Sequence, residues 1–253
     1  MESHSIDYLR TSTADLSWED RLEWLSREFP GKVCFSLGFG KEGMVIADAI
    51  FRKNLPIRVF TIDTGRLFPE TYELMDLVRA RYKTQFEVYF PESRDVEQYV
   101  RQHGVNGFYE SVENRLSCCE IRKKRPLKRA LEGAEIWITG LRKTQSDFRS
   151  QFEEFEWNEY HGLFKFNPLI NWSKEEVDEY LETHRVPTNR LHKSGFPSIG
   201  CAPCTRAIVK GESERDGRWW WETSHKECGL HLDITREVKQ STSTPITRIV
   251  KTA

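Results

Sequence analysis

Cysteines are the residues whose types and spacing most clearly predict chemistry in this chain. Cys201 and Cys204 form a Cys-x-x-Cys pair, whose spacing lets one turn direct both sulfurs toward a single centre. Cys118 and Cys119 are adjacent. Neighbouring residues on a helix diverge, so an adjacent pair suits a cluster of several metal atoms better than one small ion. Four cysteines match the ligand count of a [4Fe-4S] cluster. Zinc held by four thiolates and a site without metal are the alternatives.

Charged residues accompany these cysteines. The basic run at 122–125 follows the adjacent pair and would offset the negative charge of a thiolate-bound cluster. Its alternative interpretation is an ordinary basic helix face. Arg215 and Arg218 lie just before three consecutive tryptophans, which we expect to serve in packing.

A further cysteine, Cys228, lies in the polar sequence Glu-Cys-Gly-Leu-His. Lys226 and two histidines are close to it in the sequence, and cations favour the reactive thiolate. Cys228 is therefore the candidate nucleophile, with a buried structural cysteine as the alternative. Cys34 lies within an apolar run and is expected to be a small buried side chain.

Strand and helix patterns that could position these residues alternate along the chain. Buried strands are expected at 32–37, 57–62, 85–90 and 135–139. Helices are expected at 44–51, 70–82, 93–103, roughly 108–131, and 173–181, where Ser173 and Glu176 form a capping signature. Residues 152–167 are expected to form a hairpin. The alternation predicts an α/β fold with a doubly wound, mostly parallel sheet.

Three polar turns follow predicted strands. They are the glycine-rich turn at 36–43, the Asp63-Thr64-Gly65 turn, and the loop at 140–149 with its three cations. In doubly wound sheets ligands bind beyond the carboxyl ends of the strands. A glycine-rich turn before a helix presents backbone N–H groups to a phosphate, although no Walker motif is present. Together the turns predict a nucleotide-sized site.

Composition narrows the class of protein. The 253 residues carry 38 basic and 39 acidic side chains, so there is no bulk signature of nucleic-acid binding. No leader or membrane-length apolar run is present, and six cysteines without a signal peptide fit a reducing compartment. We expect a cytoplasmic protein. Its expected parts are an N-terminal helical segment (1–30), a nucleotide-binding domain (31–190), a cluster and catalytic segment (191–231) and a mobile polar tail (232–253).

Five stretches in order resemble the assimilatory adenylyl-sulfate reductases of the phosphoadenosine phosphosulfate reductase family. They are residues 61–72, the Cys118-Cys119 pair, 140–149, 200–206 and 226–231. The resemblance extends from about Val33 to His231. It implies a modified PP-loop fold, related to ATP pyrophosphatases, that binds adenosine 5'-phosphosulfate. One departure is that Gly43 follows Glu42 in a longer turn, where the family usually has Glu-Asp.

The resemblance also implies a role for each matching residue. The four cysteines Cys118, Cys119, Cys201 and Cys204 would bind a [4Fe-4S] cluster, and Cys228 would be the nucleophile. Ser36 and Gly38 would hold the phosphosulfate or the nucleotide phosphate. The nucleoside would be contacted by Ile62, Asp63, Thr64 and Gly65. The basic ligands of the phosphosulfate would be Lys123, Arg142, Arg149, Arg215 and Arg218. Gly140, Gln145 and His231 complete the expected substrate site.

The mechanism that the resemblance implies has two steps. The Cys228 thiolate attacks the sulfate sulfur, AMP leaves, and a dithiol reductant then releases sulfite from the S-sulfocysteine. The reductant would be thioredoxin or a glutaredoxin-like protein, and the segment at 222–231 is expected to be mobile. The pathway would be sulfate assimilation toward cysteine. A homo-oligomer is left open. The alternatives are a reductase of the 3'-phosphorylated nucleotide or of both nucleotides, a PP-loop enzyme that modifies tRNA, and a non-catalytic cluster or zinc sensor.

Overall fold

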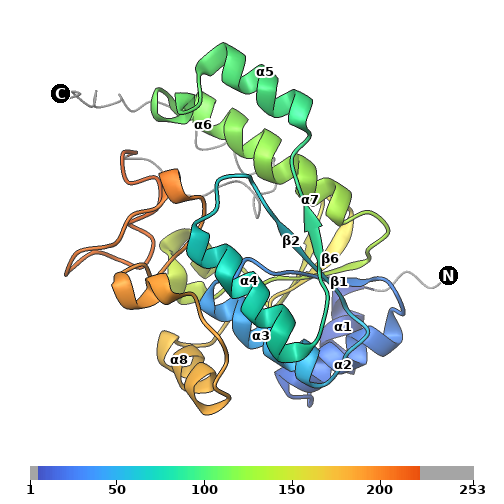
Figure 1. Cartoon of the computed structure of the whole chain (residues 1–253). Coiled ribbons are helices and arrows are strands. Elements are labelled where there is room, and N and C mark those ends of the chain that lie inside the picture. Colours follow the sequence, from blue (N-terminus) through green and yellow to red (C-terminus); the bar gives the residue numbers. More distant parts are fainter. Residues whose placement is uncertain (1–4, 223–253) are drawn as a thin grey trace.

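A six-stranded sheet with helices on both faces forms the centre of the computed structural model, which describes residues 5–222 (Figure 1). The strand order is β3-β2-β1-β4-β6-β5, and every neighbouring pair is parallel except β5 and β6. The strands are β1 (Val33–Ser36), β2 (Arg58–Ile62), β3 (Glu87–Tyr89), β4 (Ile136–Ile138), β5 (Phe155–Asn158) and β6 (Leu163–Phe166). The predicted doubly wound, mostly parallel sheet is confirmed.

Alternating side chains of the central strand enter two different cores. Val33 and Phe35 of β1 pack in the larger core, mainly with residues of four helices. These are α2 (Trp18–Glu28), α3 (Lys41–Arg52), α4 (Pro69–Tyr82) and α8 (Lys174–Thr183). Cys34, which lies between them, is fully buried on the opposite face with Leu127 and Trp137. Helices on both faces explain why the strands are apolar throughout. The expected buried role of Cys34 therefore agrees with its place in the sheet.

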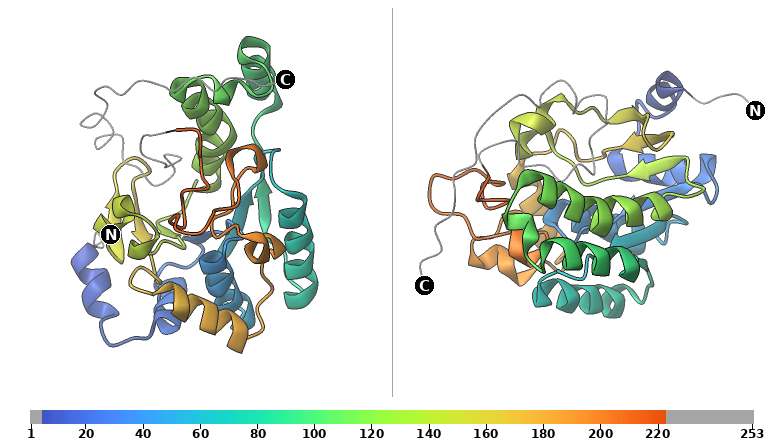
Figure 2. Two further views of the ribbon diagram at one scale, coloured as in Figure 1. Left: turned by 90° about the vertical axis from the view of Figure 1, so that its left-hand side faces the viewer. Right: turned by 90° about the horizontal axis from the view of Figure 1, so that it is seen from above.

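The remaining helices lie before the first strand or in the connection between β3 and β4 (Figure 2). They are α1 (Ile6–Ser12), α5 (Ser93–His103), α6 (Val112–Cys119) and α7 (Arg125–Ala130). A π-helical turn, η2 (Glu120–Lys124), joins α6 to α7. Short 3-10 turns are η1 (Gly107–Tyr109), η3 (Lys143–Gln145), η4 (Asp147–Gln151), η5 (Arg190–Ser194) and η6 (Ala202–Cys204).

The single helix expected at 108–131 is interrupted. Its first residues form η1, and α6 and α7 are separated by the π-helical turn. Pro126 explains this turn, because proline has no N–H and its ring clashes with the carbonyl four residues earlier. Cys118 and Cys119 end α6 directly before the turn, and Lys123 lies within it. The adjacent cysteines thus lie where the helix becomes irregular. π-helical turns of this kind are common at functional sites.

The glycine-rich turn is shorter than expected. Helix α3 begins at Lys41 with Gly40 as its N-cap, so Glu42 and Gly43 belong to its first turn. The loop after β4 approaches the start of α3 closely at Gly140: a Cβ on Gly140 would lie 3.1 Å from the Gly43 nitrogen. Backbone N–H groups at the start of α3 therefore face the end of the sheet, where anions bind helix N-termini.

The hairpin expected at 152–167 is present as β5 and β6, and it extends the sheet. Strand β6 pairs in parallel with β4, with Ile136 opposite Phe164 and Ile138 opposite Phe166. Only β5 runs antiparallel, at the edge. After α8 the chain crosses to the end of the sheet, where Ala202 N donates to Arg66 O (2.8 Å) and Tyr109 Oη donates to Pro203 O (2.5 Å). The cysteine-containing segment is thereby attached to the sheet domain.

Parts of the expected organisation lie outside the described residues. These are Cys228, His231, the segment expected to be mobile at 222–231 beyond its first residue, and the tail at 232–253. Among residues 5–222, no helix has the length and apolar character needed to cross a membrane.

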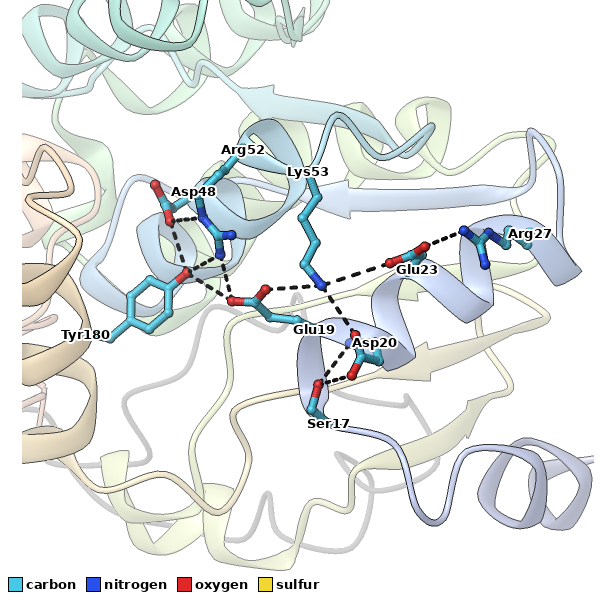
Figure 3. A network of polar contacts seen from close by, with 9 residues as sticks. All are labelled: Ser17, Glu19, Asp20, Glu23, Arg27, Asp48, Arg52, Lys53 and Tyr180. Atoms are coloured by element: carbon cyan, nitrogen blue, oxygen red, sulfur yellow. Dashed lines mark hydrogen bonds and ion pairs between the residues drawn. The ribbon is translucent and has the colours of Figure 1, made fainter.

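A polar network joins α2 and α8 to the C-terminal half of α3 (Figure 3). The buried Asp48 of α3 accepts hydrogen bonds from Tyr180 Oη (3.0 Å), Tyr82 Oη (2.7 Å) and Arg52 Nε (3.3 Å). Arg52 Nη2 also donates to Glu19 of α2 (2.7 Å). Helices α3, α4 and α8 thus meet at one carboxylate, and α2 joins them through Arg52. Buried charged groups are stable only when they are paired and hydrogen-bonded.

Replacing Tyr180 by phenylalanine tests this network. We expect Tyr180→Phe to lower the free energy of unfolding by about 1–2 kcal/mol, since Asp48 loses a charge-assisted hydrogen bond in a buried position. Tyr89→Phe is the control, because its hydroxyl contacts Glu87 at an exposed position (2.9 Å) and its loss should cost less than about 0.5 kcal/mol. Urea unfolding of both variants measures the difference. Equal losses would contradict a stabilising role of the network.

Candidate functional site

A cavity of about 280 Å³ lies beyond the carboxyl ends of β1, β2 and β4. The three polar turns predicted from the sequence meet there, together with residues 197–201 and 214–219. Ten of the expected substrate-binding residues line it: Ser36, Gly38, Ile62, Thr64, Lys123, Gly140, Gln145, Arg149, Arg215 and Arg218. The structure therefore brings together most of the expected substrate site from five separate parts of the chain.

Four cations line this cavity and are nearly inaccessible to solvent. The exposed fractions are 8% for Lys123, 7% for Arg149, 9% for Arg215 and 6% for Arg218. Arg218 Nε has no hydrogen-bond partner among the described residues, and its Nη1 lies 3.5 Å from Ser198 Oγ. Buried cations are stable when anions accompany them, and arginine binds phosphate-like groups in a planar, bidentate manner. The cavity is suited to a ligand with several negative charges.

Apolar side chains also line the cavity. Phe60, Leu127 and Trp137 line it, and Trp137 Nε1 donates to Ser36 Oγ (2.8 Å). A flat apolar wall next to a polar turn suits a purine base. Sequence reasoning missed these three residues, because an apolar side chain that lines a cavity has the same sequence signal as one in a core.

Asp63 and Gly65 shape the site without lining the cavity. Asp63 Oδ1 accepts from Gly65 N (2.8 Å) and from Tyr72 Oη (2.9 Å), which closes a tight turn around Thr64. Arg122 Nη1 donates to the Thr64 carbonyl (2.6 Å). The turn thus places the Thr64 hydroxyl 3.2 Å from Cys201 Sγ.

Arg142 is buried but is also absent from the cavity wall. Its guanidinium donates to Glu42 Oε1 (2.7 Å) and to Glu214 Oε2 (2.9 Å). We expected Arg142 to contact the substrate, but its side chain is not part of the cavity wall.

The four expected metal ligands line a second, smaller cavity. Cys118 and Cys119 come from the end of α6, and Cys201 and Cys204 from the segment around η6. Arg122 and Lys123 also line this cavity. Across residues 5–222, no three His, Cys, Asp or Glu side chains converge as ligands of one metal ion.

The electrostatic surroundings of these thiols differ. Burial, together with the neighbouring Cys119, raises the pKa of Cys118 to about 11. Burial and Cys201 raise the pKa of Cys204 to about 12. Burial also opposes ionisation of Cys201, but Lys123, the Thr64 hydroxyl and Arg218 outweigh it, so the pKa of Cys201 is lowered. A thiolate at Cys201 is therefore stabilised by the same cations that line the larger cavity.

Trp219 packs among the cysteines and is completely buried. Its Nε1–H has no hydrogen-bond partner among the described residues. Three cations lie over its ring: Arg218 at 4.7 Å, Arg115 at 5.1 Å and Lys123 at 5.6 Å from the centroid. Glu222 forms a buried ion pair with Arg115 (2.8 Å). The Nε1–H of Trp219 is thus a buried hydrogen-bond donor, without an acceptor among the described residues, close to the four thiols.

Arg218 reaches its position because residue 200 has no side chain. A Cβ on Gly200 would lie 2.2 Å from Arg218 Nη2 and 2.5 Å from its Cζ. The guanidinium therefore lies directly against the backbone that leads into Cys201. Lys123 and Cys201 line both cavities, so the anion site and the thiol site share a wall.

These residues define a class of protein in which a PP-loop-like nucleotide site lies beside a four-cysteine site. The family model described as the phosphoadenosine phosphosulfate reductase domain matches residues 32–207. The chain belongs to this family.

Two curated relatives are particularly similar. Adenosine 5'-phosphosulfate reductase of Allochromatium vinosum is 52% identical over 200 residues, covering 79% of this chain and 78% of that protein. The protein of the same name from Burkholderia cepacia is 49% identical over 202 residues, covering 79% of this chain and 81% of that protein.

Solved structures agree with this assignment of the fold. The phosphoadenylyl-sulfate reductase of Candida auris, solved as a phosphate complex, is 31% identical, with a TM-score of 0.67, and covers 79% of this chain and 97% of that one. Yeast FAD synthetase has a TM-score of 0.52 at 16% identity, covering 82% of this chain and 70% of that one. This second likeness concerns the fold alone.

Proposed function

We propose that this protein reduces adenosine 5'-phosphosulfate to sulfite and AMP in the assimilation of sulfate. The observation that carries the proposal is a cavity lined by both four buried cations and apolar side chains, since a phosphosulfate and an adenine need these two surroundings. Relatives about half identical in sequence are named for this activity.

The proposed reaction begins with Cys228. Its thiolate attacks the sulfur of the sulfate group, an S–S bond forms, and the O–S bond breaks. AMP departs with that electron pair and leaves an S-sulfocysteine. Arg149, Arg215, Arg218 and Lys123 would stabilise the negative charge that develops on the phosphate oxygen, as preorganised cations in a dry site do.

A dithiol reductant completes the cycle. One of its thiolates attacks Cys228 Sγ, and sulfite leaves with the electron pair of the S–S bond. The second thiol then resolves the mixed disulfide, so that two electrons pass from the dithiol. Thioredoxin or a glutaredoxin-like protein supplies this chemistry.

The residues of the smaller cavity fit a [4Fe-4S] cluster. Four thiols supply the full ligand set, and the orphaned Trp219 Nε1–H is a donor suited to a cluster or thiolate sulfur. Arg122 and Lys123 would offset the negative charge of the bound group. When bound by Cys118, Cys119, Cys201 and Cys204, the cluster would supply an electrostatic field and would link the segment around η6 to α6.

The proposal is tested by incubating anaerobically purified protein with adenosine 5'-phosphosulfate, without reductant, and measuring intact mass and a peptide map. A sulfonate adduct on Cys228, followed by sulfite release on addition of thioredoxin, is the expected result. An adduct that forms only with the 3'-phosphorylated nucleotide would assign the other substrate. No adduct with either nucleotide, from protein that contains iron, would refute the proposal.

Replacing Cys204 by serine tests the cluster separately. We expect Cys204→Ser to reduce the bound iron and sulfide by at least about tenfold, because one of four ligands is lost. Cys34→Ala is the matched control and should retain iron. Cys34 lies in the smaller core of the sheet, apart from the four cysteines, and burial raises its pKa to about 12. Iron and zinc are measured by elemental analysis. Bound zinc in wild-type protein, or unchanged iron in Cys204→Ser, would contradict the cluster.

A further inference from the structure

The Arg142 side chain joins two parts of the molecule that are far apart in sequence. Only 2% of it is exposed, and all three guanidinium nitrogens are used. Nε donates to Glu42 Oε1 (2.7 Å), Nη1 to Thr144 Oγ1 (2.6 Å), and Nη2 to Glu214 Oε2 (2.9 Å) and Oε1 (3.3 Å). Because a guanidinium presents its donors in a rigid plane, this arrangement fixes both carboxylates relative to each other.

The two carboxylates belong to segments that form the anion site. Glu42 lies in the first turn of α3, where the helix N-terminus favours negative charge, directly after the glycine-rich turn. Glu214 immediately precedes Arg215, and Arg218 follows three residues later. Glu42 and Glu214 line the larger cavity, whereas Arg142 lies behind them. The guanidinium therefore connects the glycine-rich turn to the arginine-bearing segment, and both segments border the cavity.

We propose that Arg142 is a positioning residue that holds Arg215 and Arg218 over the cavity by bridging Glu42 and Glu214. This inference rests on the proposed role of the two arginines as ligands of the substrate anion. Arg142 acts through them and does not touch the substrate. An anion bound by Arg142 itself would meet the two carboxylates that already surround the guanidinium, and they would repel it.

The two roles predict opposite effects for Glu214→Gln. If Arg142 positions the segment, loss of the Glu214 charge weakens the bridge and lowers activity, as Arg142→Gln does. We expect each single variant to lower kcat/KM by about 10²-fold, since a small displacement of positioned groups has this cost. The double variant should be little worse than either single one, because both remove the same bridge. If Arg142 bound the anion directly, removing a nearby negative charge would leave kcat/KM unchanged or raise it.

Arg142→Lys separates charge from geometry. Lysine keeps the positive charge but cannot reach two carboxylates and a hydroxyl with a planar fork. The positioning role predicts that this variant remains impaired by at least about tenfold, whereas recovery of wild-type kcat/KM would overturn it.

Hydrogen exchange of the full-length protein gives a readout that does not depend on turnover. We expect faster exchange at residues 214–218 in Arg142→Gln and in Glu214→Gln than in wild type. Arg190→Gln is the matched control, because Arg190 also contacts two carboxylates, Glu70 (3.5 Å) and Glu73 (3.0 Å), but at an exposed position. Exchange and kcat/KM should be unchanged in this control. Unchanged exchange at 214–218 in both bridge variants would overturn the positioning role. Wild-type protein that lacks activity would refute the proposed function alone.

Discussion

Cys228→Ser should abolish sulfite release while nucleotide binding persists. A serine hydroxyl is a far weaker nucleophile than a thiolate, and loss of a covalent nucleophile typically lowers kcat by about 10⁴-fold or more. The anion site is built from residues that precede position 222, so it does not depend on this side chain. We therefore expect AMP to bind with nearly wild-type affinity.

Two measurements check this expectation. Sulfite production with thioredoxin reports the chemical step, and calorimetric titration with AMP reports the binding step. Cys34→Ala serves as the control for removing a thiol, and it should keep activity because Cys34 is buried in the sheet and is not among the residues that line the cavity. Sulfite release by Cys228→Ser at a rate close to that of wild type would require another nucleophile.

Arg218→Gln is expected to cause the second largest loss. The Arg218 side chain is 6% exposed and lies against both the cavity and the Trp219 ring. Removing one member of a buried charge pair costs about 3–5 kcal/mol, which corresponds to a loss in kcat/KM of about 10²- to 10⁴-fold. Arg218→Lys should recover part of this loss, because it restores the charge without the bidentate geometry.

The control for this variant is Arg27→Gln, since Arg27 is exposed on α2 and, within residues 5–222, forms its ion pair with Glu23. Steady-state kinetics and AMP titration of the three variants measure the effect, and circular dichroism checks that each is folded. If Arg218→Gln changes kcat/KM by less than about threefold, the guanidinium does not bind the reacting anion.

The order of strands and helices could be predicted because parallel strands buried on both faces are apolar along their whole length. The run at 32–37 contains β1, and the Asp63-Thr64-Gly65 turn follows β2 as expected. The helix boundaries were harder to predict. Pro126 marks the break after α6 in the sequence, but proline also fits the first turn of a helix, so its effect depends on the residues before it.

The site could be predicted where a residue type is tied to its chemistry. Cysteines and arginines carry such a signal, and ten expected substrate ligands line one cavity. Phe60 and Trp137 could not be assigned, because the chemistry of an apolar wall depends on what it faces. The positioning role proposed for Arg142 could not be predicted from the sequence either. Its partner Glu214 is 72 residues away, and an ion pair at that separation is set by the fold.

Gly200 has a consequence for how this protein can change over evolution. Any side chain at position 200 would overlap the Arg218 guanidinium, with Cβ only 2.2 Å from Nη2. The two positions are therefore expected to vary together: a homologue with alanine or serine at 200 should carry a shorter residue at 218. Alanine at position 200 alone should displace the Arg218 guanidinium and lower activity, so the pair is expected to change through a less active intermediate. Gly200 and Arg218 are therefore expected to be inherited together.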